Sequence, residues 1–338
     1  MRSITIRDVA KRAGVSASTV SRVLNHTTGV RETTRKQVEE AIRAMGYSPN
    51  HLARSLSRGY TRTVGVVLPD ISNPFFPVLA RGISDVASCQ GYTVILCNSD
   101  GDATQEEASV MTLLERHVDG IIFVAGHENS SAFIRRACVT VPVVTVDREI
   151  EGLPCDTVTV DNFKGAYEIT RHLLQIGHVR VAFITGPLYL STARKRLEGF
   201  RQALKDAGIY DDPPILHGDF KYDTGYSLAR ELIRLKCGAT AVIASNDLMA
   251  IGVVRCLQNA GFSVPDDVAV AGFDDIFVAS MIQPALTTVA QPAYRMGALA
   301  AEMLLRRISG DAGAEPASVV LEPVLVVRES TQGKVGPS

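Results

Sequence analysis

The sequence predicts a small all-α headpiece at the N-terminus, followed by a larger α/β core in which parallel sheets are flanked by helices. Three observations support this prediction. Residues 5–25 have the spacing of two short helices that meet at a tight turn. Residues 1–62 hold 12 Lys and Arg against 4 Asp and Glu, or +8, whereas the remainder holds 23 against 32, or −9. Beyond residue 62, strand-like and helix-like segments alternate.

The first helices have recognisable start and stop signals. Thr5 with Asp8 forms a capping pair for the first helix, Gly14 supplies the turn, and Ser16 caps the second helix. The whole segment, TIRDVAKRAGVSASTVSRVLN, therefore has the pattern of a helix-turn-helix. In such a motif the second helix enters the major groove of DNA.

The polar and small side chains of this motif are candidates for DNA contacts. We expect base-edge contacts from Ala17, Ser18 and Arg22, with Arg22 donating to a guanine. We expect phosphate contacts from Thr5, Ser16, Thr19, Ser21 and Asn25. The alternative is a three-helix module that only packs or dimerises. The positive charge of the same segment favours DNA, because phosphate neutralisation supplies much of the affinity for a duplex.

A third helix and a short hinge follow. Residues 32–45 carry apolar side chains at helical spacing, and Gly46 is expected to end this helix. After Tyr47-Ser-Pro-Asn50, residues 51–57 predict a helix of about two turns, which is too short to be stable alone in water. This segment is expected to fold only on a partner.

The headpiece, the segment YSPNHLARSL and the following TVGVVLPDISNPFF resemble the LacI/GalR family of bacterial transcription regulators, over essentially all 338 residues. The resemblance implies a homodimer whose paired hinge helices push a leucine into the minor groove, here Leu56 with Ala53 beside it. The alternative is that Leu56 packs against its own domain. One departure is Arg31, where the family usually has a small capping residue that also touches phosphate. We expect the cap to be lost there.

The predicted domains are a headpiece (1–46), a hinge helix and linker (47–62), a core (63–330) and a short tail (331–338). The segment 63–330 is longer than a domain with a single hydrophobic core usually is, which predicts two lobes. The tail has no leucine heptads, so a tetramer built on a C-terminal coiled coil is not expected. Strands are predicted at 64–68, 93–97, 120–124, 143–146, 179–184, 241–244 and 268–271, and helices at, among others, 75–88, 194–207 and 247–260.

Open parallel sheets bind ligands beyond the carboxyl ends of their strands. At those ends the sequence places carboxylates, amides, an arginine and an aromatic residue: Asp70, Ser72, Asn73, Asp147, Arg148, Asp219, Phe220, Asn246, Asp247, Asp274 and Asp275. Such a set suits a polyhydroxylated molecule, because each hydroxyl both donates and accepts a hydrogen bond.

The core also resembles periplasmic sugar-binding proteins of the ribose-binding type, and ribose operon repressors. The resemblance implies a periplasmic-binding-protein-like fold and a sugar site lined by Asn73, Phe75, Phe76, Asp147, Arg148, Arg196, Phe220, Asn246, Asp274 and Gln291. Each residue has a structural alternative: the aspartates as loop caps, the phenylalanines as core, and Arg196 as a surface cation. Some ribose repressors have Trp in place of Arg148, which leaves the identity of the sugar open.

Together these features predict a DNA-binding repressor that binds a pseudo-palindromic operator as a homodimer and is controlled by a small sugar, ribose or similar, which releases it from DNA. Three alternatives remain: a global catabolite regulator controlled by a phosphorylated carrier protein, a purine or nucleoside sensor, and an α/β enzyme fused to a DNA-binding domain. Asn73 with Asp147 and Arg148 favours a sugar over a purine. We expect no catalysis, because GxSxG, GxGxxG, GxxxxGK[ST] and HExxH motifs are missing from the sequence.

The six cysteines form no CxxC pair and no zinc spacing with histidines, and most lie within apolar patterns, so we expect buried free thiols, no metal site and no cofactor. The sequence shows no secretory signal and no run of about 18 apolar residues. We therefore expect a cytoplasmic protein on the bacterial nucleoid, with no membrane partner, rather than a secreted sugar-binding protein.

Overall fold

The computed structural model describes residues 4–24, 29–47, 60–127, 130–150, 152–210, 212–311, 313 and 315–332. The chain divides into two compact units, residues 1–61 and 62–338. Asn25, Ala53, Leu56 and the end of the tail lie outside the described residues, so the predictions made for them stay predictions.

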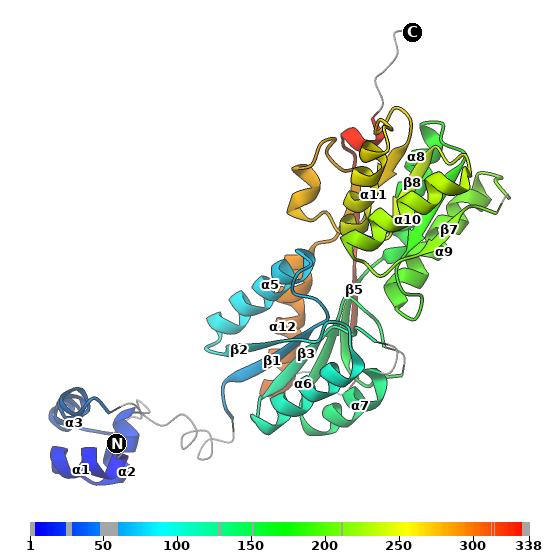
Figure 1. The fold of residues 1–338 in the computed structure, drawn as a ribbon. Helices are drawn as coiled ribbons and strands as arrows, with labels where there is room; N and C mark the ends of the chain where they lie inside the picture. Colours follow the sequence, from blue (N-terminus) through cyan, green and yellow to red (C-terminus); the bar gives the residue numbers. More distant parts are fainter. Residues whose placement is uncertain are drawn as a thin grey trace. The chain divides into compact units, whose positions relative to one another are not determined.

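The described part of the first unit contains three helices, α1 (Ile6–Ala13), α2 (Ala17–Leu24) and α3 (Glu32–Met45), drawn in blue in Figure 1. The predicted capping pair is confirmed, because the Thr5 backbone N–H donates to Asp8 Oδ2 (2.9 Å) and the Asp8 N–H donates to Thr5 Oγ1 (3.4 Å). Gly14 ends α1 in the left-handed conformation, with φ at 65°. Arg31 precedes α3 without a side-chain capping bond, as the sequence predicted.

The apolar faces of these helices meet in one small core. Its buried members are Val9, Ala10, Val20, Val23, Val38 and Ala41. All three helices contribute to it, so each is held by tertiary packing rather than by its own propensity.

The described part of the second unit contains two larger, parallel sheets and one two-stranded sheet. The first sheet has the strand order β11-β5-β4-β3-β1-β2 and is parallel throughout. Its strands are β1 (Thr63–Leu68), β2 (Thr93–Asn98), β3 (Gly120–Phe123), β4 (Val143–Val146), β5 (Asp156–Val160) and β11 (Ser318–Leu321). Helices α5 (Phe75–Cys89) and α12 (Ala293–Ser309) cover one face, and α6 (Ala103–Glu115) and α7 (Ser130–Thr140) the other (Figure 1). We call this layer the N-lobe.

The second sheet has the order β7-β6-β8-β9 and is also parallel. Its strands are β6 (Val181–Thr185), β7 (Ile215–His217), β8 (Ala241–Ala244) and β9 (Ala269–Ala271). Helices α8 (Asn162–Gln175) and α9 (Ser191–Asp206) pack on one face, and α10 (Tyr222–Leu235) and α11 (Asp247–Asn259) on the other. We call this layer the C-lobe. The two-stranded antiparallel pair β10 (Thr288–Ala290) and β12 (Val324–Val326) adjoins it, together with the 3₁₀ turns η1 (Phe277–Ser280) and η2 (Glu329–Thr331).

The chain passes three times between the lobes. These crossings lie between β5 and α8, between β10 and α12, and between β11 and β12. Asn162 stands at the first crossing and Gln291 at the second. A change in the angle between the lobes must therefore be absorbed at these three crossings, two of which carry Asn162 and Gln291.

The predicted strands are all present, within two residues at each end, and the predicted two-lobed α/β class is confirmed. The prediction did not include β5, β7, β10, β11 and β12. These strands have five residues or fewer, and β11 pairs with β5 over a long sequence separation, from Ser318↔Thr157 to Leu321↔Val160. Such short strands are set by sheet pairing rather than by a local hydrophobic run.

The prediction of buried thiols is wrong for most of the cysteines. Cys256 is buried, Cys89 is exposed, and the other four are half-buried. The physical reason is their position: Cys89 ends α5, and Cys97 lies on the edge strand β2, where an apolar pattern marks a face that is only partly covered.

Among the described helices, none is long and apolar enough to cross a membrane.

Candidate functional site

A small cavity of about 20 Å³ lies between the two lobes. Its lining contains all ten residues that the sequence resemblance implied for a ligand site, with Thr192 as the one addition: Asn73, Phe75, Phe76, Asp147, Arg148, Thr192, Arg196, Phe220, Asn246, Asp274 and Gln291. Loops that follow strands supply most of these residues, and α9 supplies Thr192 and Arg196. The carboxyl edges of the two parallel sheets therefore converge on one point, as expected for this class of fold.

Sequence reasoning missed Thr192, although a signal for it exists. Thr192 precedes Arg196 by four residues on α9, so both side chains lie on the same face of the helix. Both side chains are buried. A search for polar residues one turn away from each candidate would have found it.

Arg196 is a buried cation held by the C-lobe. Its Nε donates to Asn162 Oδ1 (2.7 Å), its Nη1 donates to the carbonyl of Ser245, and Nη1 lies 3.6 Å from Asp274 Oδ1. Its guanidinium also lies 3.7 Å from the centre of the Phe273 ring, a cation–π distance. With 3% of its surface exposed, Arg196 is not a surface cation.

Arg148 lies between aromatic rings of both lobes. Its guanidinium carbon is 5.8 Å from the ring centre of Phe76 in the N-lobe and 5.8 Å from that of Phe220 in the C-lobe. Its Nη1 donates to the carbonyl of Ala125, and its Nε lies 3.4 Å from Asp147 Oδ2. The side chain thus occupies the space between the lobes, which explains why the inner cavity is so small.

Three buried polar atoms around the cavity lack a hydrogen-bond partner among the described residues. They are Asp147 Oδ1, Arg148 Nε and Gln291 Oε1, two acceptors and one donor. Buried polar atoms are nearly always paired in folded proteins, because an unpaired one loses its hydration without compensation. Their convergence on one cavity indicates a place for a ligand that both donates and accepts hydrogen bonds.

Several lining residues also have structural roles. Asn73 Oδ1 accepts from the Phe75 N–H (3.1 Å). Asn246 Oδ1 caps α11 by accepting from the Met249 N–H (3.0 Å), and its Nδ2 donates to the carbonyl of Phe220 (2.9 Å). Phe75 packs in the hydrophobic core. These residues therefore line the cavity and also have a structural role.

The backbone at the site is strained. Asp147, Phe220 and Asp274 have φ angles of 70°, 71° and 115°, in a region that residues other than glycine rarely adopt. Strain of this kind clusters at functional sites, where the surrounding structure enforces it.

Not every polar residue at a strand end reaches the inner cavity. Asp247 Oδ2 instead accepts from the Ile276 N–H (2.8 Å) and Asp247 Oδ1 from Thr288 Oγ1 (2.5 Å), while Asp275 pairs with Arg328 Nη2 (2.6 Å). These two aspartates hold loops of the C-lobe. Asp70, Ser72 and Asp219 line a second, outer cleft.

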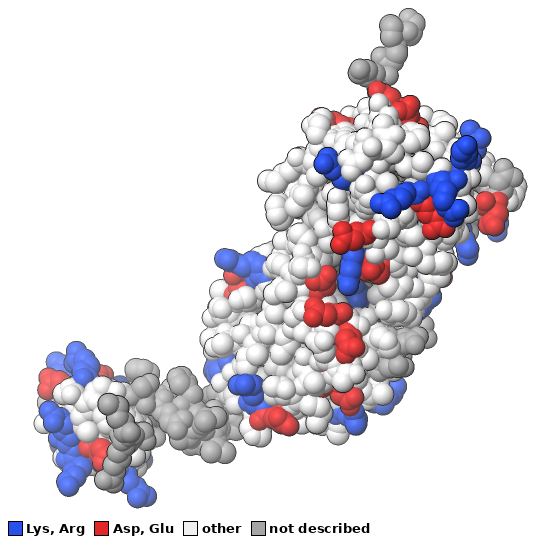
Figure 2. Space-filling model, in the orientation of Figure 1, with Lys and Arg blue, Asp and Glu red and all other residues white. Residues whose placement is uncertain are grey.

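The outer cleft has a volume of about 660 Å³ and shares Asn73, Phe76, Arg148 and Phe220 with the inner cavity. Its wall also carries four carboxylates and one lysine: Asp70, Asp100, Asp219, Asp223 and Lys221. Acidic side chains gather across the middle of the core in Figure 2. The entrance to the inner cavity is therefore predominantly acidic.

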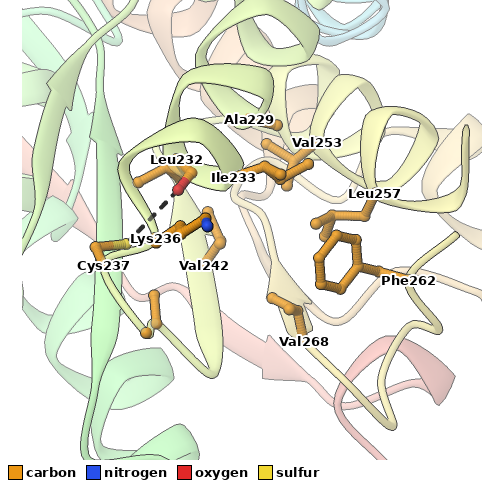
Figure 3. Close-up of a pocket in the computed structure, with 12 residues that line it drawn as sticks. Ala229, Leu232, Ile233, Lys236, Cys237, Val242, Val253, Leu257, Phe262 and Val268 are labelled. Carbon is orange, nitrogen blue, oxygen red and sulfur yellow. Dashed lines mark hydrogen bonds between the residues drawn. The ribbon is translucent and has the colours of Figure 1, made fainter. Parts of the chain in front are cut away.

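A separate pocket of about 290 Å³ lies in the C-lobe between α10, α11 and β8 (Figure 3). Its walls are almost entirely apolar, with side chains such as Leu232, Ile233, Val253, Leu257 and Phe262 facing one another. The convergent polar groups that distinguish the cavity between the lobes are missing from this lining. It is therefore unsuited to a polyhydroxylated ligand.

Burial controls the ionisation of the site carboxylates. Desolvation raises the pKa of Asp274 to about 7, although Arg196 opposes the shift, and desolvation also raises the pKa of Asp147. Desolvation and the neighbouring Asp274 raise the pKa of Asp247 well above its usual value. The site therefore carries a carboxyl group that titrates near neutral pH.

We expect the stability of Asp274→Asn to rise relative to that of the wild type as the pH increases from 5 to 8. The folded state binds the Asp274 proton more tightly than the unfolded chain, so its contribution is present at low pH and lost as the pH rises through about 7. Urea unfolding at pH 5 and pH 8 measures this difference. An equal pH dependence in both proteins would contradict the assignment.

The exposed face of α2 is the candidate DNA-binding surface. Ser18 and Arg22 are exposed one turn apart, whereas Ala17 is half-buried and packs partly on the headpiece core. Ser16 Oγ forms hydrogen bonds with Ser18 Oγ (2.8 Å) and Thr19 Oγ1 (2.9 Å), and it accepts from the Thr19 N–H, which confirms its predicted capping role.

Two other residues predicted to contact phosphate are among the described residues. Thr5 is exposed at the start of α1, and Ser21 is half-buried on α2. Lys and Arg side chains project around the headpiece in Figure 2.

A helix-turn-helix headpiece followed by a two-lobed core with a polar cavity defines the class of ligand-responsive DNA-binding regulators. Residues 5–50 match the family described as bacterial regulatory proteins, lacI family, and residues 61–328 match the periplasmic binding proteins and sugar binding domain of LacI family. The chain belongs to the LacI family of bacterial transcription regulators, as the sequence resemblance indicated.

Individual relatives support this assignment over nearly the full length. The chain is 38% identical to the ribose operon repressor of Escherichia coli K12, covering 96% of this chain and 99% of that protein. It is 36% identical to catabolite control protein A of Priestia megaterium, covering 98% and 100%. Because these identities are nearly equal, sequence identity alone does not indicate which effector this chain binds.

Solved structures agree with the fold. The lac repressor dimer bound to operator and the anti-inducer ONPF matches with a TM-score of 0.89 at 28% identity, covering 98% of this chain and 100% of that chain. A LacI family regulator from Enterococcus faecium with bound ribose matches with a TM-score of 0.72 at 35% identity, covering 79% and 98%. Members of this family are transcriptional regulators rather than enzymes.

Proposed function

We propose that the protein is a dimeric repressor that binds a pseudo-palindromic operator and is released when a small neutral sugar, ribose or a similar molecule, occupies the cavity between the lobes. The observation that carries the effector part is a set of three buried atoms that have no hydrogen-bond partner among the described residues, Asp147 Oδ1, Arg148 Nε and Gln291 Oε1. A sugar hydroxyl can donate to either oxygen and accept from the guanidinium.

The charges favour a neutral ligand. Inside the cavity two carboxylates, Asp147 and Asp274, face two guanidinium groups, Arg148 and Arg196. The outer cleft has more carboxylates than cations. A phosphorylated ligand would meet repulsion at this entrance, whereas hydroxyl groups can hydrogen-bond both signs of charge. The rings of Phe76 and Phe220 provide surfaces for the apolar faces of a sugar.

The volumes imply that ligand binding moves the protein. The inner cavity of about 20 Å³ has room for about one water molecule. The outer cleft of about 660 Å³ is in the range of ligand pockets. A sugar that reaches the inner atoms must displace the Arg148 side chain or change the separation of the lobes.

Contacts at the crossings connect the cavity to that separation. Gln291 Nε2 donates to Asp274 Oδ1 (2.7 Å), and Arg196 donates to Asn162 Oδ1. Asn162 and Gln291 stand where the chain passes between the lobes. A ligand on these residues can therefore favour one lobe arrangement over another. Switching operator occupancy from nearly full to nearly none requires about 10⁴-fold differential affinity, or about 5.5 kcal/mol.

For the DNA-binding half, we propose base contacts from Ala17, Ser18 and Arg22 and phosphate contacts from the polar residues that flank them. Ala53 and Leu56 of the hinge would act in the minor groove. The exposed position of Ser18 and Arg22 on α2 supports the first part.

Two observations support dimerisation of this chain. It is similar to the lac repressor, whose solved structure is a dimer, and it has an exposed apolar surface. Val78, Phe277 and Tyr294 are large, exposed side chains that line one surface hollow. Exposed apolar side chains that gather in this way usually mark an interface. We propose that α5, which carries Val78, and α11 contribute to contacts between subunits.

We expect Leu56→Ala to weaken operator binding by at least about tenfold with unchanged sugar affinity, because an apolar wedge contributes only on DNA. Asp274→Ala is expected to do the reverse, because Asp274 faces the cavity. DNA-binding anisotropy and calorimetry on both variants measure the two activities. Comparable loss of both activities in either folded variant would contradict this division.

The effector assignment is tested by calorimetric titration of the full chain with D-ribose, since the chain has no Trp to report binding. Saturable heat at micromolar to submillimolar affinity supports the proposal. No heat at several temperatures with ribose, other pentoses and hexoses would overturn it, and binding of a nucleoside or of a phosphorylated carrier protein would identify the alternative regulator.

A further inference from the structure

Two cysteines that are separated in sequence meet in the N-lobe. Cys138 lies in the last turn of α7, and Cys155 immediately precedes β5. Both are half-buried against the core between α6, α7 and the sheet. Both also line a surface pocket of about 320 Å³, together with Val139, Pro154 and Arg307. A small solute can therefore approach them from solvent.

The thiols interact with each other. The Cys155 thiol is hydrogen-bonded to Cys138, and this bond, with a smaller contribution from the positive charge of Arg135, lowers the pKa of Cys138. The same bond and burial raise the pKa of Cys155. For Cys97 and Cys256, in contrast, burial is the main influence and raises the pKa. The thiolate is the reactive form of cysteine, so this arrangement favours Cys138 as the first group to react.

We propose that Cys138 and Cys155 form a peroxide-sensitive site that closes to an intrachain disulfide. The thiolate sulfur of Cys138 attacks one oxygen of hydrogen peroxide, the O–O bond breaks, and hydroxide leaves to give a sulfenic acid. The sulfur of Cys155 then attacks the Cys138 sulfur, the S–O bond breaks, the S–S bond forms, and the departing hydroxide takes the Cys155 proton and leaves as water. Two thiols are oxidised, and one peroxide is reduced to two water molecules.

The position of the pair relates it to the cavity between the lobes. The disulfide would close a ring over residues 138–155, which contains β4 and, directly after it, Asp147 and Arg148. It would join the end of α7 to the start of β5 on either side of β4. Disulfides in a reducing compartment are usually transient and redox-sensing, and this one would constrain the segment that carries two lining residues of the cavity.

The site is tested on the reduced full chain by adding hydrogen peroxide in steps, blocking free thiols and mapping peptides without reduction. We expect the 138–155 linkage to appear before any modification of the exposed Cys89. Cys155→Ser should instead accumulate a dimedone-reactive sulfenic acid at Cys138, and Cys89→Ser should form the linkage as the wild type does. Oxidation of Cys89 first, with no 138–155 linkage, would overturn the proposal, and this result needs only the wild-type protein.

The effect on the ligand is a separate measurement that rests on the proposed function. We expect ribose affinity to differ by about fivefold or more between reduced and oxidised wild type, with no difference in Cys138→Ser. Unchanged affinity despite a mapped disulfide would overturn the coupling. Failure of the reduced protein to bind ribose would instead contradict the effector assignment, so the two failures are distinguishable.

Discussion

Asp147→Asn is expected to lower the affinity for the sugar effector about 10- to 100-fold, because hydrogen bonds to a charged group contribute about 1.5–3 kcal/mol. The substitution keeps the shape of the side chain but removes its charge. Asp147 Oδ1 has no partner among the described residues, and Asp147 Oδ2 lies 3.4 Å from Arg148 Nε. The variant therefore replaces the charged acceptor available to a ligand with a neutral amide, and it also removes the ion pair that orients Arg148.

The matched control is Asp223→Asn. Asp223 is an exposed carboxylate on the wall of the outer cleft and does not line the inner cavity. We expect its ribose affinity to stay within about twofold of the wild type, since surface charge effects are small. Calorimetry on both variants, with operator binding measured in parallel, checks this prediction. Equal loss of affinity in the two variants would show that general electrostatics, rather than the inner cavity, controls binding.

Arg22→Ala is expected to weaken binding to the specific operator by about 1–3 kcal/mol and to relax the preference for one base pair in each half-site. Arg22 is exposed on α2, one turn beyond Ser18, on the face that a helix-turn-helix presents to the major groove. Competition binding with operators substituted at single positions measures both effects.

Arg12→Ala is the control for charge alone. Arg12 is an exposed cation in the last turn of α1, outside the helix that reads bases. Its removal should weaken the binding of specific and non-specific DNA alike and reduce the salt dependence of DNA binding. The same base preference in Arg22→Ala as in the wild type would exclude Arg22 from base reading.

Local chemistry made the headpiece predictable. Thr5 with Asp8, Gly14 and Gly46 are signals that act within a few residues, and the structure shows each of them at the predicted helix end. The missing cap at Arg31 was predictable for the same reason. Buried parallel strands such as β8 were also predictable, because both of their faces are covered and their residues form continuous apolar runs.

Features that depend on distant parts of the chain were not predictable from local patterns. The pairing of β11 with β5 joins a segment near the end of the core to one in its middle. The hydrogen bond between Arg196 and Asn162, and the meeting of Cys138 with Cys155, depend on how helices and crossings pack. Six of the ten candidate lining residues were also predicted from their positions at strand ends, and the other four came from family resemblance alone. That Asp147 Oδ1 and Gln291 Oε1 have no hydrogen-bond partner among the described residues could be found only from atomic positions.

The central claim is that a sugar in the cavity between the lobes controls DNA binding, and one titration tests it most directly. DNA selected from a random library by the full chain without sugar supplies a labelled operator, and its anisotropy is followed as D-ribose is added. We expect release of the operator over the concentration range in which calorimetry shows binding. Saturation of the cavity with ribose, with no change in operator affinity, would contradict it.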